Sequence, residues 1–278
     1  MNSDSQQKYY RIGDFAKYMG VTPDFLKHYE GNGLLEVQQS ANGYRHYPFS
    51  QSAQILEYMR LRNYGVSVKE MRSYLSAGGE EAVALLDKKA EDMRLQAERM
   101  LAIVEEHRRI KSWFDERRRK PVDWEVRNVE AHCFLPHTNE QDFFMDERIY
   151  PLLKAWVDWM PIAKSSLRIT PLKGQERRYS TSWGMILPAP IAQRYAIPLN
   201  GSIETMPATK AFVYHFVGME ALFSIDRIAR GEHPMFDAMA QLGLKPAGTL
   251  YLVVEMKLTN PNGSRRGGSG RFIVPIVE

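Results

Sequence analysis

The chain has 278 residues, 44% of them hydrophobic and 25% charged, which is typical of an ordinary globular protein long enough for two domains. Its single cysteine, Cys133, excludes an intrachain disulfide framework and disfavours a thiolate metal site unless a dimer shares it, so we expect no metal and no cofactor. The sequence shows no signal-like segment and no apolar run of membrane length, which predicts a cytoplasmic protein without membrane contact. A net charge of +4 does not by itself indicate nucleic-acid binding.

The first thirty residues have the pattern of two short helices joined by a glycine turn. Apolar residues on one helical face predict a first helix that Gly20 ends. Thr22-Pro23-Asp24 then supplies an N-cap, a first-turn proline and an acid for a second helix, which we expect to end near Glu30. Two short helices around such a turn are the outline of a helix-turn-helix.

A hairpin is expected after the second helix. Leu34 and Leu35 are predicted to begin its first strand, Asn42-Gly43 is a pair that suits a tight turn, and the return strand is Tyr44–Tyr47. Arginine and tyrosine near the tip of such a ribbon can bind phosphate, which would make it a wing. Alternatively, the tyrosines face inward and the ribbon only packs against the domain.

Two more helices complete this first domain. Ser50 is expected to cap the third, and Ser67-Val68-Lys69-Glu70 is a capping box that opens the fourth. The start of the fourth helix would offer free backbone N–H groups to a phosphate.

A long helix is predicted from about Glu80 to Lys120, where Pro121 stops it. Residues spaced alternately by four and three form a heptad seam along it, and they are Leu86, Ala90, Met93, Ala97, Met100, Val104, His107, Lys111 and Phe114. A helix of this length cannot bury the stripe against itself. We therefore expect a second copy of the chain as its partner, with packing onto the protein's own core as the alternative.

The remainder of the chain reads as an α+β domain in which strand, helix, strand, strand occurs twice. The strands are expected at 124–135, 183–187, 203–208, 211–216, 249–258 and 271–277, and the helices at 146–160 and 235–242. The stretches 126–131 and 203–208 look like weak copies of each other, which indicates a duplicated domain with a cleft between its halves.

Glu255 stands out in the apolar strand Leu250–Leu258. Alternation places it on the same face as Tyr251 and Val253. It is therefore either on a solvated face or buried with a partner, because an unpaired buried carboxylate is costly. A bound organic cation would supply such a partner.

The ordered motifs of residues 9–79 closely resemble the MerR family of transcription regulators. They are Tyr10–Ala16, Gly20–Pro23, Leu26–Glu30, Gly33–Leu35, Asn42–Tyr47 and Gly65–Glu70. The resemblance implies a winged helix-turn-helix, a two-fold dimer through an antiparallel coiled coil, and regulation by distortion of promoter DNA. The DNA-binding residues that it implies are Arg11, Lys17, Thr22, Pro23, Lys27, His28, Tyr29, Tyr44, Arg45 and Ser67.

The sequence departs from the family pattern in two places. Lys27-His28 stands where family members usually carry Arg-Tyr, and lysine lacks the bidentate fork of arginine, which puts operator preference in doubt. Cysteines near the end of the long helix, which the metal-sensing branch uses, are absent, and this argues against a metal sensor.

The last domain is similar to the GyrI-like effector domain of BmrR-type multidrug-responsive activators. In such domains an acid on a late strand meets lipophilic cations, and Glu255 before Leu258-Thr259-Asn260-Pro261 matches that place. Aromatic residues usually line the pocket. The candidates here are Trp156, Trp183, Tyr214, Tyr251 and Phe272, although such residues are more often plain core.

We therefore expect three parts: a winged helix-turn-helix head (1–79), a coiled-coil dimerisation helix (80–120) and a GyrI-like α+β effector domain (121–278). The function expected is a homodimeric transcription activator, not an enzyme, that binds double-stranded promoter DNA, responds to a lipophilic cationic effector and acts on RNA polymerase. The alternatives are a GyrI-like hydrolase, in which Glu255 positions water, and a constitutive DNA-binding regulator with a vestigial pocket.

Overall fold

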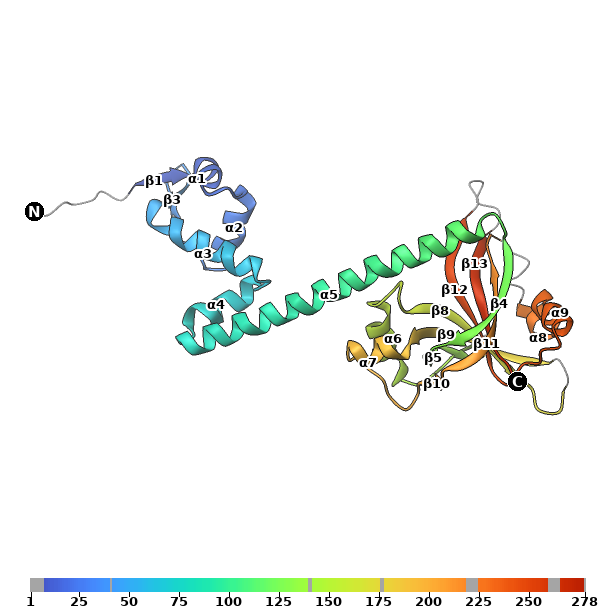
Figure 1. Ribbon diagram of the computed structural model, residues 1–278. Helices are drawn as coiled ribbons and strands as arrows, with labels where there is room; N and C mark the ends of the chain where they lie inside the picture. The colour runs from blue at the N-terminus through green and yellow to red at the C-terminus, as the bar shows by residue number, and fades with distance from the viewer. Residues whose placement is uncertain are drawn as a thin grey trace, which may run out of the picture. The chain divides into compact units, whose positions relative to one another are not determined.

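The computed structural model describes residues 8–40, 42–139, 142–175, 178–218, 225–259 and 266–277. The chain divides into two compact units, Met1–Glu98 and Arg99–Glu278, and helix α5 (Gly79–Arg117) contributes residues to both (Figure 1). No helix in these ranges is long and apolar enough to cross a membrane.

The first unit contains the predicted helix-turn-helix. Its elements before α5 are β1 (Tyr9–Arg11), α1 (Ile12–Met19), α2 (Pro23–Gly31), β2 (Gln38–Gln39), β3 (Arg45–Pro48), the 3-10 helix η1 (Phe49–Gln51), α3 (Ser52–Asn63) and α4 (Val68–Ser76). Gly20 ends α1 with a left-handed φ of 67°, and the Thr22 side chain accepts a hydrogen bond from the Phe25 amide at the start of α2. The capping box between Ser67 and Glu70 is present at α4. These local predictions are confirmed.

Two details of the head differ from prediction. Leu34 and Leu35 are buried in the head core and do not form a strand, and the hairpin partner of β3 is Gln38–Gln39. The apolar side chains of the two leucines are stabilised by burial in this helical core, and this does not require pairing with a strand. Ser50 lies inside η1 and does not cap α3, which begins at Ser52.

Helix α5 confirms the predicted long helix, because it runs for 39 residues without interruption. The residues of its heptad seam have two different environments. Leu86 packs against the head core, whereas Met93, Met100 and Val104 remain about half exposed within the chain. Among the residues that the structure describes, none covers this apolar row.

The second unit is built on one antiparallel sheet of eight strands within the described residues, in the order β10-β5-β9-β8-β12-β13-β11-β4. The strands are β4 (Val122–Val129), β5 (His132–Pro136), β8 (Lys164–Pro171), β9 (Tyr179–Pro188), β10 (Glu204–Met206), β11 (Thr209–Phe216), β12 (Leu250–Thr259) and β13 (Arg266–Pro275). A separate small hairpin pairs β6 (Thr138–Asn139) with β7 (Asp142–Phe143).

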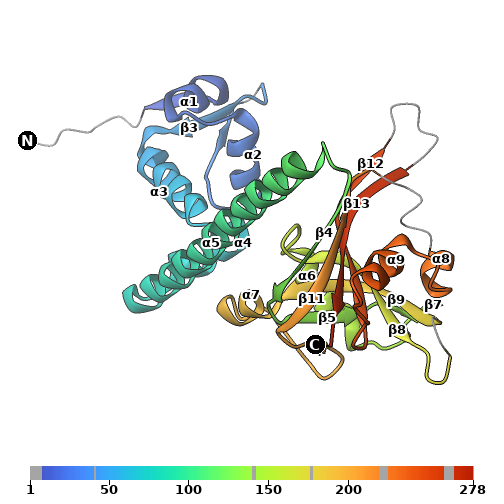
Figure 2. The same cartoon turned by 45° about the vertical axis from the view of Figure 1, so that its right-hand side comes forward.

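Three short helices pack on one side of this sheet, which we call the Leu252 face. They are α6 (Ile149–Val157), α8 (Ile225–Ala229) and α9 (Pro234–Gln241), and a fourth short helix, α7 (Ala189–Arg194), directly follows β9. Helices α8 and α9 lie beside the sheet (Figure 2), and their residues join Leu252 and Phe272 in one apolar cluster. Helix α6 belongs to a second cluster built on β5 and β9. The opposite side, the Val253 face, carries a third cluster that includes Tyr251, Val253 and Ile273.

The sheet order reveals the predicted duplication. Each half has a first strand, a helix, and a β-hairpin, namely β5-α6-β8-β9 and β11-α9-β12-β13. The two stretches that look like copies form β4 and β10, and each pairs with the first strand of the other half. This exchange of edge strands joins the halves into one continuous sheet.

The boundaries of several predicted elements differ from those observed. Helix α6 covers only the middle of the predicted 146–160, and α7, α8 and β8 carry too few periodic residues to be recognised from the sequence. Strand β13 begins at Arg266, five residues before the expected start at 271. Asn260 and Pro261, part of the turn used in the GyrI-like comparison, lie outside the described residues.

Candidate functional site

Helix α2 presents polar side chains from its solvent-facing side. Thr22 and Pro23 begin the helix, and Lys27 and His28 follow one turn later on its exposed surface. Lys27 forms an exposed ion pair with Asp24 at 3.1 Å, which is weak in water and easily exchanged for a phosphate. The second helix of a helix-turn-helix is the one that enters the major groove, and these side chains occupy that place.

A hollow of about 450 Å³ in the head gathers four of the residues predicted to bind DNA. They are Thr22, His28, Tyr29 and Ser67, and the hollow also includes Arg62, which the sequence analysis did not identify. The side chain and the amide of Ser67 are engaged with Glu70. Any phosphate contact at the start of α4 must therefore use the amides that follow Ser67.

Tyr29 is mainly a core residue, although it lines this hollow. Its ring stacks on Phe25 with centroids 4.1 Å apart and on Tyr58 at 5.4 Å. Burial raises the pKa of its hydroxyl. The residue therefore supports α2 from the inside, with only its edge available to a ligand.

The wing side chains divide between internal and external contacts. Tyr44 is exposed, and the guanidinium of Arg11 lies 5.3 Å from the centre of its ring. Arg45 donates from Nε to the Glu30 carboxylate at 3.1 Å, and the Tyr47 hydroxyl donates to the same carboxylate at 2.9 Å. Because Arg45 uses only Nε in these bonds, its terminal nitrogens remain available to a phosphate.

Lys17 lies exposed on α1, away from these internal bonds. The structure thus places nine of the ten residues predicted to bind DNA at least partly in reach of solvent, Tyr29 being the buried exception.

The second unit contains a larger cavity of about 670 Å³. It lies on the Val253 face of the sheet, and residues from Ala102 to Arg109 of α5 and Ile191 and Arg194 of α7 also line it. We call it the charged cavity, and its lining residues include Glu105, Glu106, Arg109, Arg127, Glu130, His132, Ile162, Lys164, Pro188, Ile191, Arg194, Tyr195, Arg271 and Ile273.

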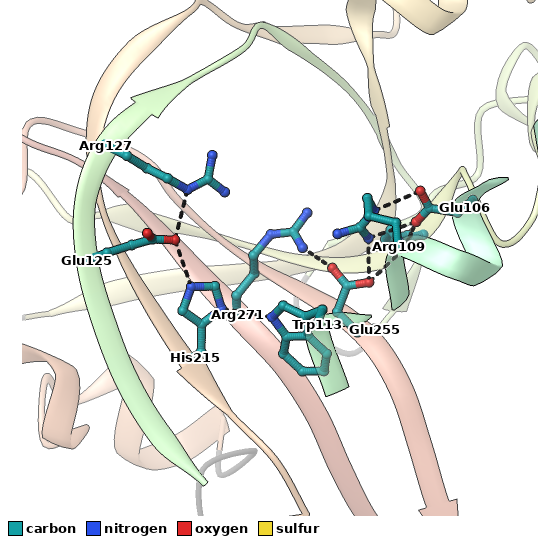
Figure 3. Close-up of polar contacts among 9 residues, drawn as sticks. Glu106, Arg109, Trp113, Glu125, Arg127, His215, Glu255 and Arg271 are labelled. Atoms are coloured by element: carbon teal, nitrogen blue, oxygen red, sulfur yellow. Dashed lines mark hydrogen bonds and ion pairs between the residues drawn. The ribbon is translucent and has the colours of Figure 1, made fainter. Parts of the chain in front are cut away.

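Glu255 lies beside this cavity and pairs with Arg109 and Arg271, which line it (Figure 3). Its Oε2 accepts hydrogen bonds from Lys164 Nζ at 2.8 Å and from Arg109 Nη2 at 2.9 Å, and its Oε1 pairs with Arg271. Glu106 accepts from the same lysine at 2.5 Å and from the same arginine at 2.7 Å. We call Glu106, Arg109, Lys164, Glu255 and Arg271 the Glu255 cluster.

The Glu255 side chain is fully buried, which decides between the two alternatives that the sequence left open. It faces the same side as Val253, as alternation predicts, although a β-bulge between Val254 and Met256 interrupts the ladder at this point. Burial alone would raise the pKa of Glu255, but the charges of Arg271, Lys164 and Arg109 lower it to about 2. Cations of the chain itself therefore supply its partners.

The structure does not bring the predicted aromatic residues together around Glu255. Trp156 is buried and donates from Nε1 to the Pro198 carbonyl, while Tyr214, Phe272 and Trp183 pack with the core of the Leu252 face. Tyr251 is on the Val253 face and borders a separate hollow of about 330 Å³. None of these five lines the charged cavity.

The basic residues of the cavity were not predicted from the sequence. A usable signal was nevertheless present, since Lys164 directly follows Ile162-Ala163 and Arg271 directly precedes Phe272-Ile273-Val274. The reasoning applied to Glu255, that a charge in an apolar strand needs a partner, applies equally to them.

Two buried histidines near the cavity are neutral at physiological pH. Burial, together with the charges of Arg271 and Arg127, lowers the pKa of His132 to about 4. Burial and Arg117 lower the pKa of His215 to about 4 as well.

His215 connects the end of α5 to the cavity wall (Figure 3). Trp113 of α5 donates from its indole to His215 Nδ1 at 3.0 Å. An indole N–H only donates, so the proton of the neutral ring is on Nε2, which lies 3.3 Å from Glu125. Glu125 also accepts from Arg127, a residue of the cavity wall, at 3.1 Å.

Comparison with known proteins gives a match over the head domain. Residues 10–78 match the family model of the MerR HTH family regulatory protein. The chain is 33% identical over 95 residues to the nodulation protein NolA of Bradyrhizobium elkanii, covering 34% of this chain and 43% of that protein. It is 35% identical over 80 residues to an uncharacterized HTH-type transcriptional regulator of Pseudomonas aeruginosa, covering 28% and 61%. The chain therefore spans less than two thirds of either relative.

Among solved structures, the cryo-EM structure of the EcmrR–DNA complex in EcmrR-RPo aligns with 97% of this chain and 100% of that chain. The sequence identity is 14% and the TM-score 0.37, a likeness too low to carry an argument. The family match and the observed order of elements in the head agree with each other. Residues 10–78 of this chain are a helix-turn-helix domain of the MerR family.

Proposed function

We propose that this protein is a ligand-responsive, DNA-binding transcription activator that acts as a homodimer. The observation that carries the proposal is the MerR-family match of residues 10–78, in a head whose α2 presents Lys27 and His28 to solvent. The proposed DNA contacts are those of Arg11, Lys17, Thr22, Pro23, Lys27, His28, Tyr29, Tyr44, Arg45 and Ser67, with Arg62 added by the structure.

The homodimer is supported by α5. Met93, Met100 and Val104 follow one another at heptad spacing and remain exposed in the single chain. Burying each such side chain contributes roughly 1.5–3 kcal/mol, so a second copy of the helix would be a favourable partner. The dimer would place two head domains on one palindromic site.

We propose that the charged cavity is the effector site of a GyrI-like domain. Glu106 and Arg109 of α5 line it together with strands of the sheet, so an effector there would contact the helix that forms the dimer. An effector that fits one arrangement of α5 better than another would shift the heads and the DNA between them. The altered promoter geometry would then suit RNA polymerase.

The effector expected from the resemblance is a lipophilic cation with Glu255 as its counter-charge. In this structure three cations of the chain already pair with Glu255, and Glu255 does not line the cavity. A cation would have to displace these pairs. The same bonds disfavour the enzyme alternative, because a carboxylate held in this way is poorly placed to activate water.

Selection of binding sites from random double-stranded DNA tests the regulator proposal. We expect the full chain to enrich a palindromic site, and the double variant Lys27→Ala/His28→Ala to lose most of that enrichment. Lys154→Ala, at an exposed position of α6, is the matched control and should behave as wild type. Enrichment of no sequence by the wild-type chain would refute DNA recognition.

A further inference from the structure

We propose that the charged cavity binds an organic anion with an apolar body, such as an aryl-alkyl carboxylate, rather than a cation. The inference rests on the proposed function, because it names the class of effector for that site. It stands on the charges that line the cavity, on unused hydrogen-bond donors among them, and on the apolar part of the wall.

The lining carries an excess of positive charge. Its basic residues are Arg109, Arg127, Lys164, Arg194 and Arg271, whereas its acidic residues are Glu105, Glu106 and Glu130. Glu105 is exposed, and its charge pairs with Arg108, which does not line the cavity. Within the Glu255 cluster itself, three cations face two carboxylates. A ligand carboxylate would equalise the numbers of positive and negative groups in this cluster, whereas a ligand cation would increase the excess of positive charge.

Two of the arginines have donors to spare. Arg271 is almost completely buried and pairs with Glu255, but its Nε has no hydrogen-bond partner among the described residues. Arg194 lies at the rim with its guanidinium 5.2 Å from the Tyr195 ring centre, and no carboxylate in the described part of the chain pairs with it. An unsatisfied buried donor is unfavourable, and a carboxylate accepts from arginine in a bidentate manner.

The protonation behaviour of neighbouring groups agrees with a positive site. Burial lowers the pKa of Arg271, and the charges of Arg109 and Arg127 lower it further against the opposing effect of Glu255. His132, which also lines the cavity, is kept neutral in part by Arg271 and Arg127. An anion bound beside these groups would offset the repulsion between the neighbouring positive charges.

The rest of the wall suits an apolar ligand body. Ile162, Pro188, Ile191, Tyr195 and Ile273 supply the non-polar part of the lining. The volume of about 670 Å³ lies within the roughly 300–1,000 Å³ of small-molecule sites. An aromatic or aliphatic group of this size could contact these residues while its carboxylate reaches Arg271 or Arg194.

The test is a fluorescence titration of the full chain with three probes that share one pyrene body. The probes are 1-pyrenebutyrate (anionic), 1-pyrenebutanol (neutral) and 1-pyrenebutylamine (cationic). We expect pyrenebutyrate to bind at least about tenfold more tightly than pyrenebutylamine, with pyrenebutanol between them.

Variants locate the binding. Arg271→Gln should weaken pyrenebutyrate binding by about tenfold and leave pyrenebutanol within about twofold. Since Arg271 is buried and its variant could misfold, Arg194→Gln at the exposed rim gives a second measure, with an expected loss of about threefold or more. Arg148→Gln, whose side chain is exposed and pairs with Asp146 away from the cavity, is the matched control.

The outcomes separate this inference from the proposed function. Equal or tighter binding of pyrenebutylamine would overturn the anion assignment and leave a ligand-responsive regulator in place. Binding of none of the three probes by a chain that still selects its DNA site would overturn the effector cavity as well. Preference for pyrenebutyrate without DNA binding would support the anion site and overturn the regulator proposal.

Discussion

Glu255 shows how a buried charge is made tolerable in this protein. Its carboxylate has no solvent contact, yet three basic side chains pair with it and a second acid, Glu106, shares two of them. Removing one member of such a network is more costly than the net strength of the intact network suggests, because the remaining charges stay buried without compensation. The cluster therefore couples the end of α5 to strands β8, β12 and β13.

We predict that Glu255→Gln destabilises the second unit by roughly 3 kcal/mol at neutral pH. The pKa of Glu255 falls from 4.5 to about 2 on folding, so its contribution is fully present above pH 4.5 and is lost as the pH falls toward 2. The difference between wild type and variant should shrink over that window. All five tryptophans lie beyond residue 98, so tryptophan fluorescence during urea unfolding reports this unit alone.

Glu105→Gln is the control for this measurement, because Glu105 is exposed and pairs only with Arg108. Its effect should stay within about 0.5 kcal/mol at every pH. A Glu255→Gln protein as stable as wild type from pH 7 to pH 3 would show that the ion pairs contribute nothing to the fold.

Gly270 of β13 has no room for a side chain. A Cβ atom built there lies 2.4 Å from the carbonyl oxygen of Val253, and one built at Gly184 of β9 lies 2.3 Å from that of Leu135. Neither backbone can retreat, so Gly270→Ala should cost roughly 2–4 kcal/mol by the same fluorescence measurement. Gly201→Ala, with open space around it, should be nearly neutral. Comparable stability of the two variants would contradict the close approach.

At the scale of elements, α5 has different roles along its length. Its early turns pack on the head core through Leu86, and its later turns reach the sheet of the second unit through Ile103, Arg109 and Trp113. The exposed apolar row between these anchors has no partner within the described chain, and the dimer proposal concerns this row.

Replacing both Met93 and Met100 with Glu should abolish the proposed dimer. The four carboxylates of two such chains would meet in one apolar seam, where like charges are strongly disfavoured. Sedimentation velocity at micromolar concentration should show a dimer for wild type and a monomer for the variant. The control is Glu91→Gln, since Glu91 is an exposed member of a local ion pair with Arg94. A monomeric wild-type protein would refute the assignment.

The wing strand β3 gives the other prediction at this scale. Arg45→Ala should weaken binding to the selected DNA site and to random DNA alike, and should reduce the salt dependence by about one phosphate contact. The variant also leaves Glu30 with only Tyr47 as a partner, so its circular dichroism must be compared with wild type. Loss of affinity for the selected site alone would mean that Arg45 reads bases.

At the scale of the whole chain, the second unit is a duplicated structure with unequal halves. Gly184 and Gly270 occupy equivalent strands, and β4 and β10 are exchanged between the halves. The charges, however, are not duplicated. Lys164 comes from one half, Glu255 and Arg271 from the other, and Arg109 from α5, so the charged cavity exists only where these three parts meet.

The elements whose signals are local could be predicted from the sequence alone. The Gly20 stop, the Thr22 cap, the Ser67–Glu70 capping box and the uninterrupted α5 depend on residues within a few positions of one another, and all were predicted correctly. Alternation likewise identified the face of β12 to which Glu255 belongs. Local hydrogen bonds and side-chain periodicity decide such features before any distant contact forms.

The partners of Glu255 could not be predicted from the sequence. Its partners are 16, 91 and 146 residues away in the chain, and periodicity states which face a residue occupies but not which distant strand lies beside it. The same limit explains why Trp156, Tyr214 and Phe272 were grouped with Glu255, although the sheet and its packing separate them from it. The order of the strands determines which charged residues meet in the cavity, and non-local packing determines that order.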